Sequence, residues 1–193
     1  MNLDVKEWKE FNISYLFKIS GTKTTSIEDL DEQQVYPYIT TQAGNNGVES
    51  YSSFYTEKGN VLTIDSAVLG QCFYQKENFT ASDHVEKLTP LFDMSIFHAL
   101  FIQTIINREK YKYYYGRKRS QKVLKQEIIK LPIEYELNDN GTFKLDSDNN
   151  KIPKIDETHK YSKEGYIPDF KFMEDYIKSL NHKPITTANV RGG

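Results

Sequence analysis

Hydrophobic positions follow a strand-like pattern through the first ninety residues of the chain. The runs VYPYIT, GNVLTID, GQCFYQ and HVEKLTP are rich in β-branched and aromatic residues and are separated by turn-forming residues. The stretch QAGNNGV carries the Asn-Gly signal of a tight turn. Short strands at this spacing predict a small, curved, mostly antiparallel sheet. Ahead of them, WKEFNISYLFKISGT predicts a short helical turn or strand that ends at Gly21, and residues 22–34 predict a surface loop.

The apolar spacing changes to a helical period after Asp93, which is the predicted N-cap of a largely buried helix. In MSIFHALFIQTIIN the apolar residues recur every three or four positions, as one face of a helix requires. Gly116 is expected to break this helix. Ser120 then predicts the cap of a second helix that runs through Ile128 and is closed by Pro132.

The last third of the chain alternates polar and apolar segments. IEYEL predicts a further strand-like piece, and we expect the compact domain, residues 1–137, to end there. Residues 138–165 are polar, contain Asp139-Asn140-Gly141, and predict a hairpin or mobile connector. An amphipathic helix is predicted within 166–180, and 181–193 should form a flexible tail. The predicted fold class is α+β, with helices packed on the sheet and one helix at the C-terminus.

Composition limits the classes of protein to which the chain can belong. The 193 residues, 38% of them hydrophobic, suffice for one domain with an appendage. A mean hydropathy of −0.65 and the lack of a long apolar run predict a soluble protein with no membrane span. The opening segment MNLDVKEWKEF shows neither a secretory signal nor a transit peptide, so we expect a cytoplasmic protein. Cys72 is the single cysteine, so no disulfide can form within the chain. It lies among apolar neighbours, so we expect a buried strand cysteine rather than a reactive thiol.

Catalytic signatures are missing from the sequence. It contains no Gly-rich phosphate loop, no GxSxG elbow and no HExxH pair. Asp83 and His84 form the best acid and base pair, but their neighbours are turn formers, so a structural role is favoured. His98, inside an apolar helix, is likewise expected to be a packed histidine. The sequence therefore predicts no enzyme, no metal site and no cofactor.

A basic stretch stands out in a chain whose formal net charge is only −2. Between residues 108 and 125 only Glu109 opposes the cations, which are Arg108, Lys110, Lys112, Arg117, Lys118, Arg119, Lys122 and Lys125. Cations at this density repel one another unless a polyanion is near, and phosphates fit them well. A solvated basic face balanced by acidic segments elsewhere is the alternative. The neighbouring tyrosines could serve as core residues or as stacking groups.

Two polar loops add candidate contacts with nucleic acid. Amide side chains are suited to adenine edges, and lysine is suited to guanine or phosphate. The loop residues with this chemistry are Lys23, Thr24, Thr25, Thr40, Thr41, Gln42, Asn45 and Asn46. The same residue types are ordinary turn formers, so the loops alone do not decide between the two roles.

Six segments together resemble a known family. WKEFNISYLFKISGTKTT, YPYITTQAGNNGV, FYTEKGNVLTIDSAVLGQCFYQ, ASDHVEKLTP, YYYGRKRSQKVLKQEIIKLP and GYIPDFKFMEDYIKSL are similar, in this order, to the target-recognition domain of type I restriction-modification specificity (S) subunits. The variant of type IIG and BcgI-like systems is the most similar. The resemblance runs from about residue 7 to 180.

The resemblance implies a non-catalytic module that selects a double-stranded DNA sequence for partner methyltransferase and restriction subunits. It places the two loops on the DNA together with Arg117, Lys118, Arg119, Ser120, Gln121 and Lys122. It also implies that one face of the C-terminal helix forms a subunit interface, with Phe172, Met173, Tyr176 and Ile177.

The chain departs from the family in two ways. A full specificity subunit carries two recognition domains separated by long helices, whereas this sequence shows one domain and a short last helix. Residues 134–165 also look like an insertion. The chain is then either a half-subunit that forms a homodimer or a single recognition module of a larger enzyme. A diverged protein-interaction module that no longer binds DNA is the alternative, and the slightly acidic net charge favours it.

Overall fold

The computed structural model describes residues 5–31 and 34–180, and in them it shows an α+β fold. Its centre is a four-stranded antiparallel sheet in the order β2 (Phe17–Gly21), β8 (Val85–Pro90), β5 (Val61–Asp65) and β6 (Cys72–Gln75). All five side chains of β5 are buried, as expected for an inner strand. The expected fold class and the mostly antiparallel pairing are confirmed, with the strands distributed over three open sheets.

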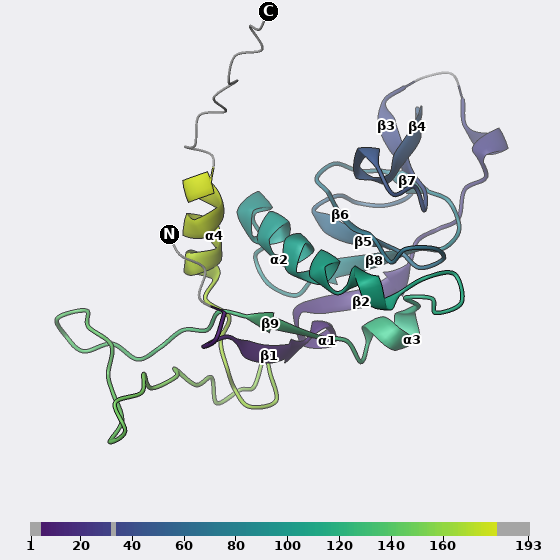
Figure 1. The fold of residues 1–193 in the computed structure, drawn as a ribbon. Coiled ribbons are helices and arrows are strands. Elements are labelled where there is room, and N and C mark those ends of the chain that lie inside the picture. The colour runs from purple at the N-terminus through teal and green to yellow at the C-terminus, as the bar shows by residue number, and fades with distance from the viewer. Residues whose placement is uncertain (1–4, 32–33, 181–193) are drawn as a thin grey trace, which may run out of the picture.

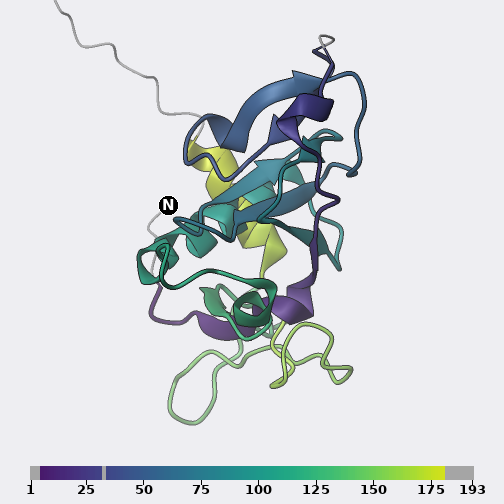
Figure 2. The same cartoon turned by 90° about the vertical axis from the view of Figure 1, so that its right-hand side faces the viewer.

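Two smaller sheets flank this central sheet (Figure 1). The first orders β4 (Val48–Ser52), β3 (Tyr36–Ile39) and β7 (Thr80–Ala81), and its β3–β7 pair is parallel. The second pairs β1 (Lys9–Asn12) with β9 (Ile128–Leu131). In both views the three-stranded sheet lies above the central sheet and residues 138–165 lie below it (Figure 2).

Short helical turns connect several of these strands. The opening segment is a strand, then the single turn α1 (Ile13–Leu16), then β2, so both predicted conformations occur there. The 3-10 turns η1 (Ile27–Asp29), η2 (Asn45–Gly47) and η3 (Lys110–Lys112) lie in loops.

Helix α2 (Ile96–Arg108) packs its apolar face on the main core, where Leu62, Leu88, Ile102 and Ile106 are fully buried. The predicted N-cap at Asp93 is wrong. Ser95 caps the helix instead, because its hydroxyl accepts from the backbone N–H of His98 while the His98 ring accepts from Ser95 N–H. The helix also ends well before Gly116.

The second predicted helix is much shorter than expected. Helix α3 covers only Gln121–Leu124, and Ile128 lies in strand β9 opposite Asn12. In β9 the buried residues Ile129 and Leu131 alternate with exposed ones, which is the period of a strand. The sheet partner β1 therefore overrides the local helical spacing.

The predicted C-terminal helix is present as α4 (Phe170–Leu180), with its first turn capped by Asp169, whose carboxylate accepts from Phe172 N–H. Helix α4 lies beside α2 of the same chain (Figure 1). The apolar face expected at a subunit interface is thereby partly covered by α2. Met173 is fully buried, and the Tyr176 ring lies 5.9 Å from that of Phe101. Met173 is therefore a core residue, which corrects its assignment to an accessible interface.

Residues 134–167 form a long double excursion, here named the arm, that leaves the core and returns to it. Isolated β-bridges join Ile133 to Pro168 and Tyr135 to Pro153 at its base. Two turns further out are closed by bridges between residues 137 and 143 and between 145 and 151. The expected strand at IEYEL is reduced to such bridges.

The predicted tail, 181–193, lies outside the described residues. Among the helices that the structure describes, none has the length and apolar character of a membrane span.

Candidate nucleic-acid interface

Three connecting segments emerge at one end of the central sheet, here named the loop end. Gly21 closes β2 opposite Glu86, and Asp65 closes β5 opposite Val85. Strands that end together bring their following segments together. The loop end consists of residues 22–25, 66–71 and 82–84.

A basic loop, residues 109–118, lies against the loop end. Its exposed side chains include Tyr111 and Tyr115, each 77% exposed, and the cations Arg117 and Lys118. Lys110 Nζ donates to Gln71 Oε1 at 2.8 Å, which links the basic loop to the segment after β5. The Lys112 and Lys118 ammonium groups lie 5.8 Å and 5.9 Å from the centroids of the Tyr111 and Tyr115 rings. The loop thus presents exposed aromatic rings together with positive charge, a combination suited to a nucleic acid backbone and its bases.

Arg119, expected to hold phosphate, is fully buried and anchors this loop from inside. Its guanidinium pairs with both oxygens of Glu127 and donates to the carbonyl oxygens of Gly70, at 2.7 Å, and Ile106, at 3.2 Å. The Tyr113 ring stacks on it with 4.7 Å between the guanidinium carbon and the ring centroid. The prediction that Arg119 contacts DNA is therefore corrected: it holds together the loop from which its neighbours project.

The loop at residues 22–25 likewise contains both exposed and buried candidate residues. Lys23 and Thr24 are exposed, and the backbone N–H of Lys23 donates to the buried Glu57 at 2.7 Å. Thr25 is buried, its N–H donates to Ala81 O at 2.8 Å, and its hydroxyl lies 3.3 Å from that of Thr80. Lys23 and Thr24 can meet a ligand, whereas Thr25 is part of the fold.

The asparagine amides of the loop at residues 40–46 are hydrogen-bonded to the strands beside it. Asn45 Nδ2 donates to Val48 O at 2.8 Å and Asn46 Nδ2 to Tyr74 O at 3.0 Å, and both residues have a positive φ. The Thr40 hydroxyl accepts from Gln42 N–H at 3.2 Å. The Gln42 amide makes longer contacts, from Nε2 to Gly44 O at 3.5 Å and to Val48 O at 3.4 Å. Because these contacts are at the long limit of hydrogen bonding, the exposed Gln42 and the half-buried Thr41 are the candidates of this loop for reading bases.

The segment after Arg119 lies beside the loop end. Gln121 is half-buried against Gly21 and Glu86, Ser120 is half-buried before α3, and Lys122 is exposed. Burial raises the pKa of the Glu86 carboxyl, although Gln121 and Ser66 partly oppose this. Lys122 is thus the accessible cation of this segment.

The structure adds a turn to the loop end that sequence reasoning did not select. Residues Ser66–Gly70 follow β5 and expose Val68 and Leu69. The sequence signal that could have found it is an aspartate just before a short apolar run that ends in glycine, because carboxylates cap such turns and glycine tolerates a positive φ.

A family model described as "Type I restriction modification DNA specificity domain" matches residues 5–141. That range contains the loop end and the basic loop. The chain belongs to this family.

Relatives of this specificity domain include the "Type II restriction enzyme BgcI specificity subunit S.BcgI" of Heyndrickxia coagulans, 25% identical over 182 residues. That match covers 92% of this chain and 45% of the relative. The crystal structure of a type I restriction-modification S subunit from M. genitalium shares the fold, with a TM-score of 0.52 and 16% identity, over 65% of this chain and 34% of the other. The chain thus spans less than half the length of either relative.

Other polar groups of the specificity domain have structural roles. His84 Nε2 lies 3.5 Å from the Asp83 carboxylate in an exposed turn where His84 has a φ of 58°. His98 is buried in the cap of α2, and its Nε2 lies 3.1 Å from Phe170 O. Among the described residues, no group of three or more His, Cys, Asp and Glu side chains could hold a metal ion.

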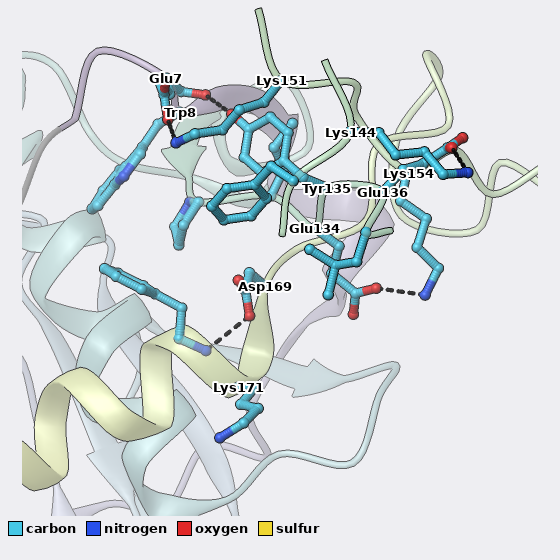
Figure 3. Close-up of a pocket in the computed structure, with 15 residues that line it drawn as sticks. Glu7, Trp8, Glu134, Tyr135, Glu136, Lys144, Lys151, Lys154, Asp169 and Lys171 are labelled. Carbon is cyan, nitrogen blue, oxygen red and sulfur yellow. Dashed lines mark hydrogen bonds and ion pairs between the residues drawn. The ribbon is translucent and has the colours of Figure 1, made fainter. Parts of the chain in front are cut away.

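The specificity domain also has a groove of about 810 Å³ between the arm, Trp8 and the start of α4 (Figure 3). Its cations are matched by carboxylates: Lys151 pairs with Glu7 at 2.7 Å and Lys154 with Glu134 at 2.8 Å. Such neutralised lysines offer little attraction to phosphates. The groove therefore differs in charge from the basic loop.

Proposed function

We propose that this chain is a non-catalytic module that recognises a double-stranded DNA sequence for a restriction-modification system, acting in the cytoplasm. The observation that carries the proposal is the basic loop: Arg117 and Lys118 project to solvent from a loop whose own base, Arg119, is locked in the core. A preordered cationic loop loses little entropy when it meets a polyanion. The family to which the chain belongs supports the same role.

The exposed cations and the accessible polar loop residues would make different kinds of contact with DNA. Arg117, Lys118 and Lys122 would contact phosphates and fix the position of the chain on the duplex. Gln42, Thr41 and Thr24 would then reach base edges, because their side chains stay accessible on adjoining loops. Phosphate contacts supply affinity for any sequence, and base contacts supply the choice among sequences.

The net charge of −2 is compatible with DNA binding, because the charges are unevenly distributed. Lysines of the arm, such as Lys144 and Lys154, pair with nearby carboxylates, whereas Arg117 and Lys118 have no ion pair among the described residues. Positive potential is therefore concentrated at one place, as steering of DNA requires.

Partner subunits would complete the activity. We propose that a methyltransferase and a restriction subunit act at the selected site, and that the chain either pairs with a second copy or serves a larger enzyme. The half-buried residues Phe172, Tyr176 and Ile177 along α4 are the proposed interface, since their outer edges remain accessible after packing on α2. Analytical ultracentrifugation of the chain alone and with its methyltransferase would distinguish these assemblies.

The decisive experiment is selection from a randomised duplex library by the purified chain, alone and with the methyltransferase. A selected motif of roughly three to five bases would establish a reader, since one module contacts about that many base pairs. Two inverted copies at a fixed spacing would add a dimer. Failure to enrich any sequence, with weak retention of nonspecific DNA at low salt, would contradict the proposal and indicate a protein partner instead.

Matched variants separate phosphate contacts from general charge. The triple variant R117A, K118A, K122A should bind all duplexes more weakly and reduce the salt slope, log K against log salt, by about one for each phosphate that the protein no longer neutralises. The control K144A, K154A, K163A removes the same charge from the arm. It should leave the slope unchanged; an equal effect of both variants would reject the assignment to the basic loop.

A further inference from the structure

The turn after β5 is held rigid at its first residues by one carboxylate. Asp65 is only 5% exposed, and its two oxygens accept from three successive backbone N–H groups, those of Ala67 at 2.8 Å, Val68 at 3.0 Å and Leu69 at 2.7 Å. Charge-assisted hydrogen bonds to backbone N–H groups are among the stronger ones in proteins. The turn therefore has little freedom to move.

The far side of the same turn is held by the base of the basic loop. Gly70 has a φ of +64°, and its carbonyl accepts from Arg119 at 2.7 Å. A side chain at Gly70 would meet Tyr113 and Arg119 atoms at 3.1 Å, so only glycine fits there. The turn and the base of the basic loop thus form one unit, linked again by the hydrogen bond from Lys110 to Gln71.

This unit exposes two adjacent aliphatic side chains. Val68 is 41% and Leu69 44% exposed, on a turn whose backbone N–H groups are already satisfied. Single exposed apolar residues are common on protein surfaces. Here, however, the pair is preordered, and the next two residues, Gly70 and Gln71, bind Arg119 and Lys110 at the base of the basic loop. A duplex held by the cations of that loop would therefore pass close to the pair.

We propose that Val68 and Leu69 contact the C5-methyl groups of thymine in the major groove, so that this turn selects thymine within the target. The inference rests on the DNA-binding function proposed above. The methyl group of thymine is the apolar feature of the major-groove edge and suits an aliphatic partner. Insertion between base pairs suits the turn less well, because more than half of each side chain is covered by the protein and the backbone cannot extend.

The test replaces each thymine of the selected duplex by deoxyuridine, which removes only the methyl group. Wild-type protein should bind the uracil duplex about fourfold more weakly for each methyl it contacts, the change expected from burying one methyl group. The variant V68A, L69A should bind both duplexes with equal affinity. The control V35A, L91A changes two exposed aliphatic residues outside this turn and should keep the difference.

The outcomes separate this inference from the function on which it rests. If wild-type protein selects a sequence but binds thymine and uracil duplexes alike, or if the selected motif lacks thymine, the turn does not read methyl groups and the DNA-binding function stands. If V68A, L69A retains the full thymine preference, other residues read the methyl groups and the inference is wrong. If wild-type protein selects no sequence at all, both proposals fail.

Discussion

Two arginines separated by a single residue have opposite environments in this protein. Arg117 projects into solvent, while Arg119 is fully buried with Glu127 as its partner. Nothing in the segment GRKRS distinguishes them, because the distinction comes from groups far along the chain: the carbonyls of Gly70 and Ile106. The same residue type thus stabilises the fold at one position and is exposed at the other, where we propose that it binds DNA.

Substitution of these arginines should separate stability from binding. R119A leaves Glu127 buried and uncompensated, so we expect the free energy of unfolding to fall by about 3–5 kcal/mol. R117A should change it by no more than about 0.5 kcal/mol, as for an ordinary surface position. Urea unfolding followed by circular dichroism measures both. Equal, small effects would show that Arg119 is not the buried anchor.

Cys72 should be chemically inert in the folded protein. Burial raises the pKa of its thiol to about 12, outweighing the nearby Arg119 guanidinium, which acts in the opposite direction. Because the thiolate is the reactive form, a disulfide reagent at about pH 8 should not label the native chain. In urea the same reagent should label one thiol per chain. Rapid labelling without denaturant would contradict the buried position.

At the scale of elements, local pattern and tertiary partner compete for the segment after Ser120. Apolar spacing there favours a helix through Ile128, yet the chain turns after Leu124 and enters β9. The turn places Glu127 against Arg119 and lets Ile129 and Leu131 fill the core. A helix would satisfy local propensity but leave β1 without its partner, and burial outweighs propensity.

The capping residue of helix α4, Asp169, lowers the stability of the folded protein by an amount that depends on pH. Burial raises the pKa of Asp169 above its ordinary 3.8, although the hydrogen bond from Phe172 N–H opposes this. Below that ordinary value the carboxyl is protonated in both states. As the pH rises through the window between the unfolded and the raised folded pKa, the unfolded chain ionises more readily, so this group lowers stability.

The variant D169N should remove that penalty and keep the cap, because the amide oxygen can still accept from Phe172 N–H. The stability of the variant relative to wild type should therefore increase as the pH rises above the ordinary pKa of an aspartate, about 3.9, and become constant once the pH exceeds the raised pKa of the folded state. Urea unfolding at intermediate pH values measures the difference. A constant difference across the range would mean that Asp169 is not desolvated in the folded chain.

At the scale of the whole molecule, the arm and the loop end are separate parts. The outer arm, residues 138–150, is exposed throughout and lies beyond β1 and β9 (Figure 1). The loop end lies at the tips of the central sheet, and the hydrogen bonds of its anchors, Arg119 and Asp65, involve no arm residue among those the structure describes. The two parts should therefore be separable by deletion.

Replacement of residues 138–150 by a short Gly-Ser turn should leave folding and DNA affinity almost unchanged. Glu136 N–H already donates to Ile152 O at 2.9 Å, so the chain ends to be joined lie side by side. Circular dichroism and DNA binding by fluorescence anisotropy test this expectation. Loss of DNA affinity in a folded variant would show that the arm takes part in binding, whereas loss of methyltransferase binding alone would assign it to a partner.

The sequence by itself determined the α+β class, the central strands, helices α2 and α4, and the family. These features follow from the local spacing of apolar residues. A period of two indicates the buried face of a strand and a period near 3.6 that of a helix, and neither depends on which element packs against that face. The ordered segments of the resemblance extend over most of the chain, and the family match to residues 5–141 agrees with them. The buried strand position of Cys72 was likewise readable from its apolar neighbours.

Only the tertiary structure decided which polar residues are accessible. Thr25 and Arg119 were indistinguishable from Thr24 and Arg117 by type and spacing, yet they are buried by Thr80 and Glu127. Val68 and Leu69 likewise looked like an ordinary apolar run and are exposed by the cap at Asp65. Exposure depends on groups brought together by the closure of the chain, sometimes from dozens of residues away, and no local pattern encodes those distances.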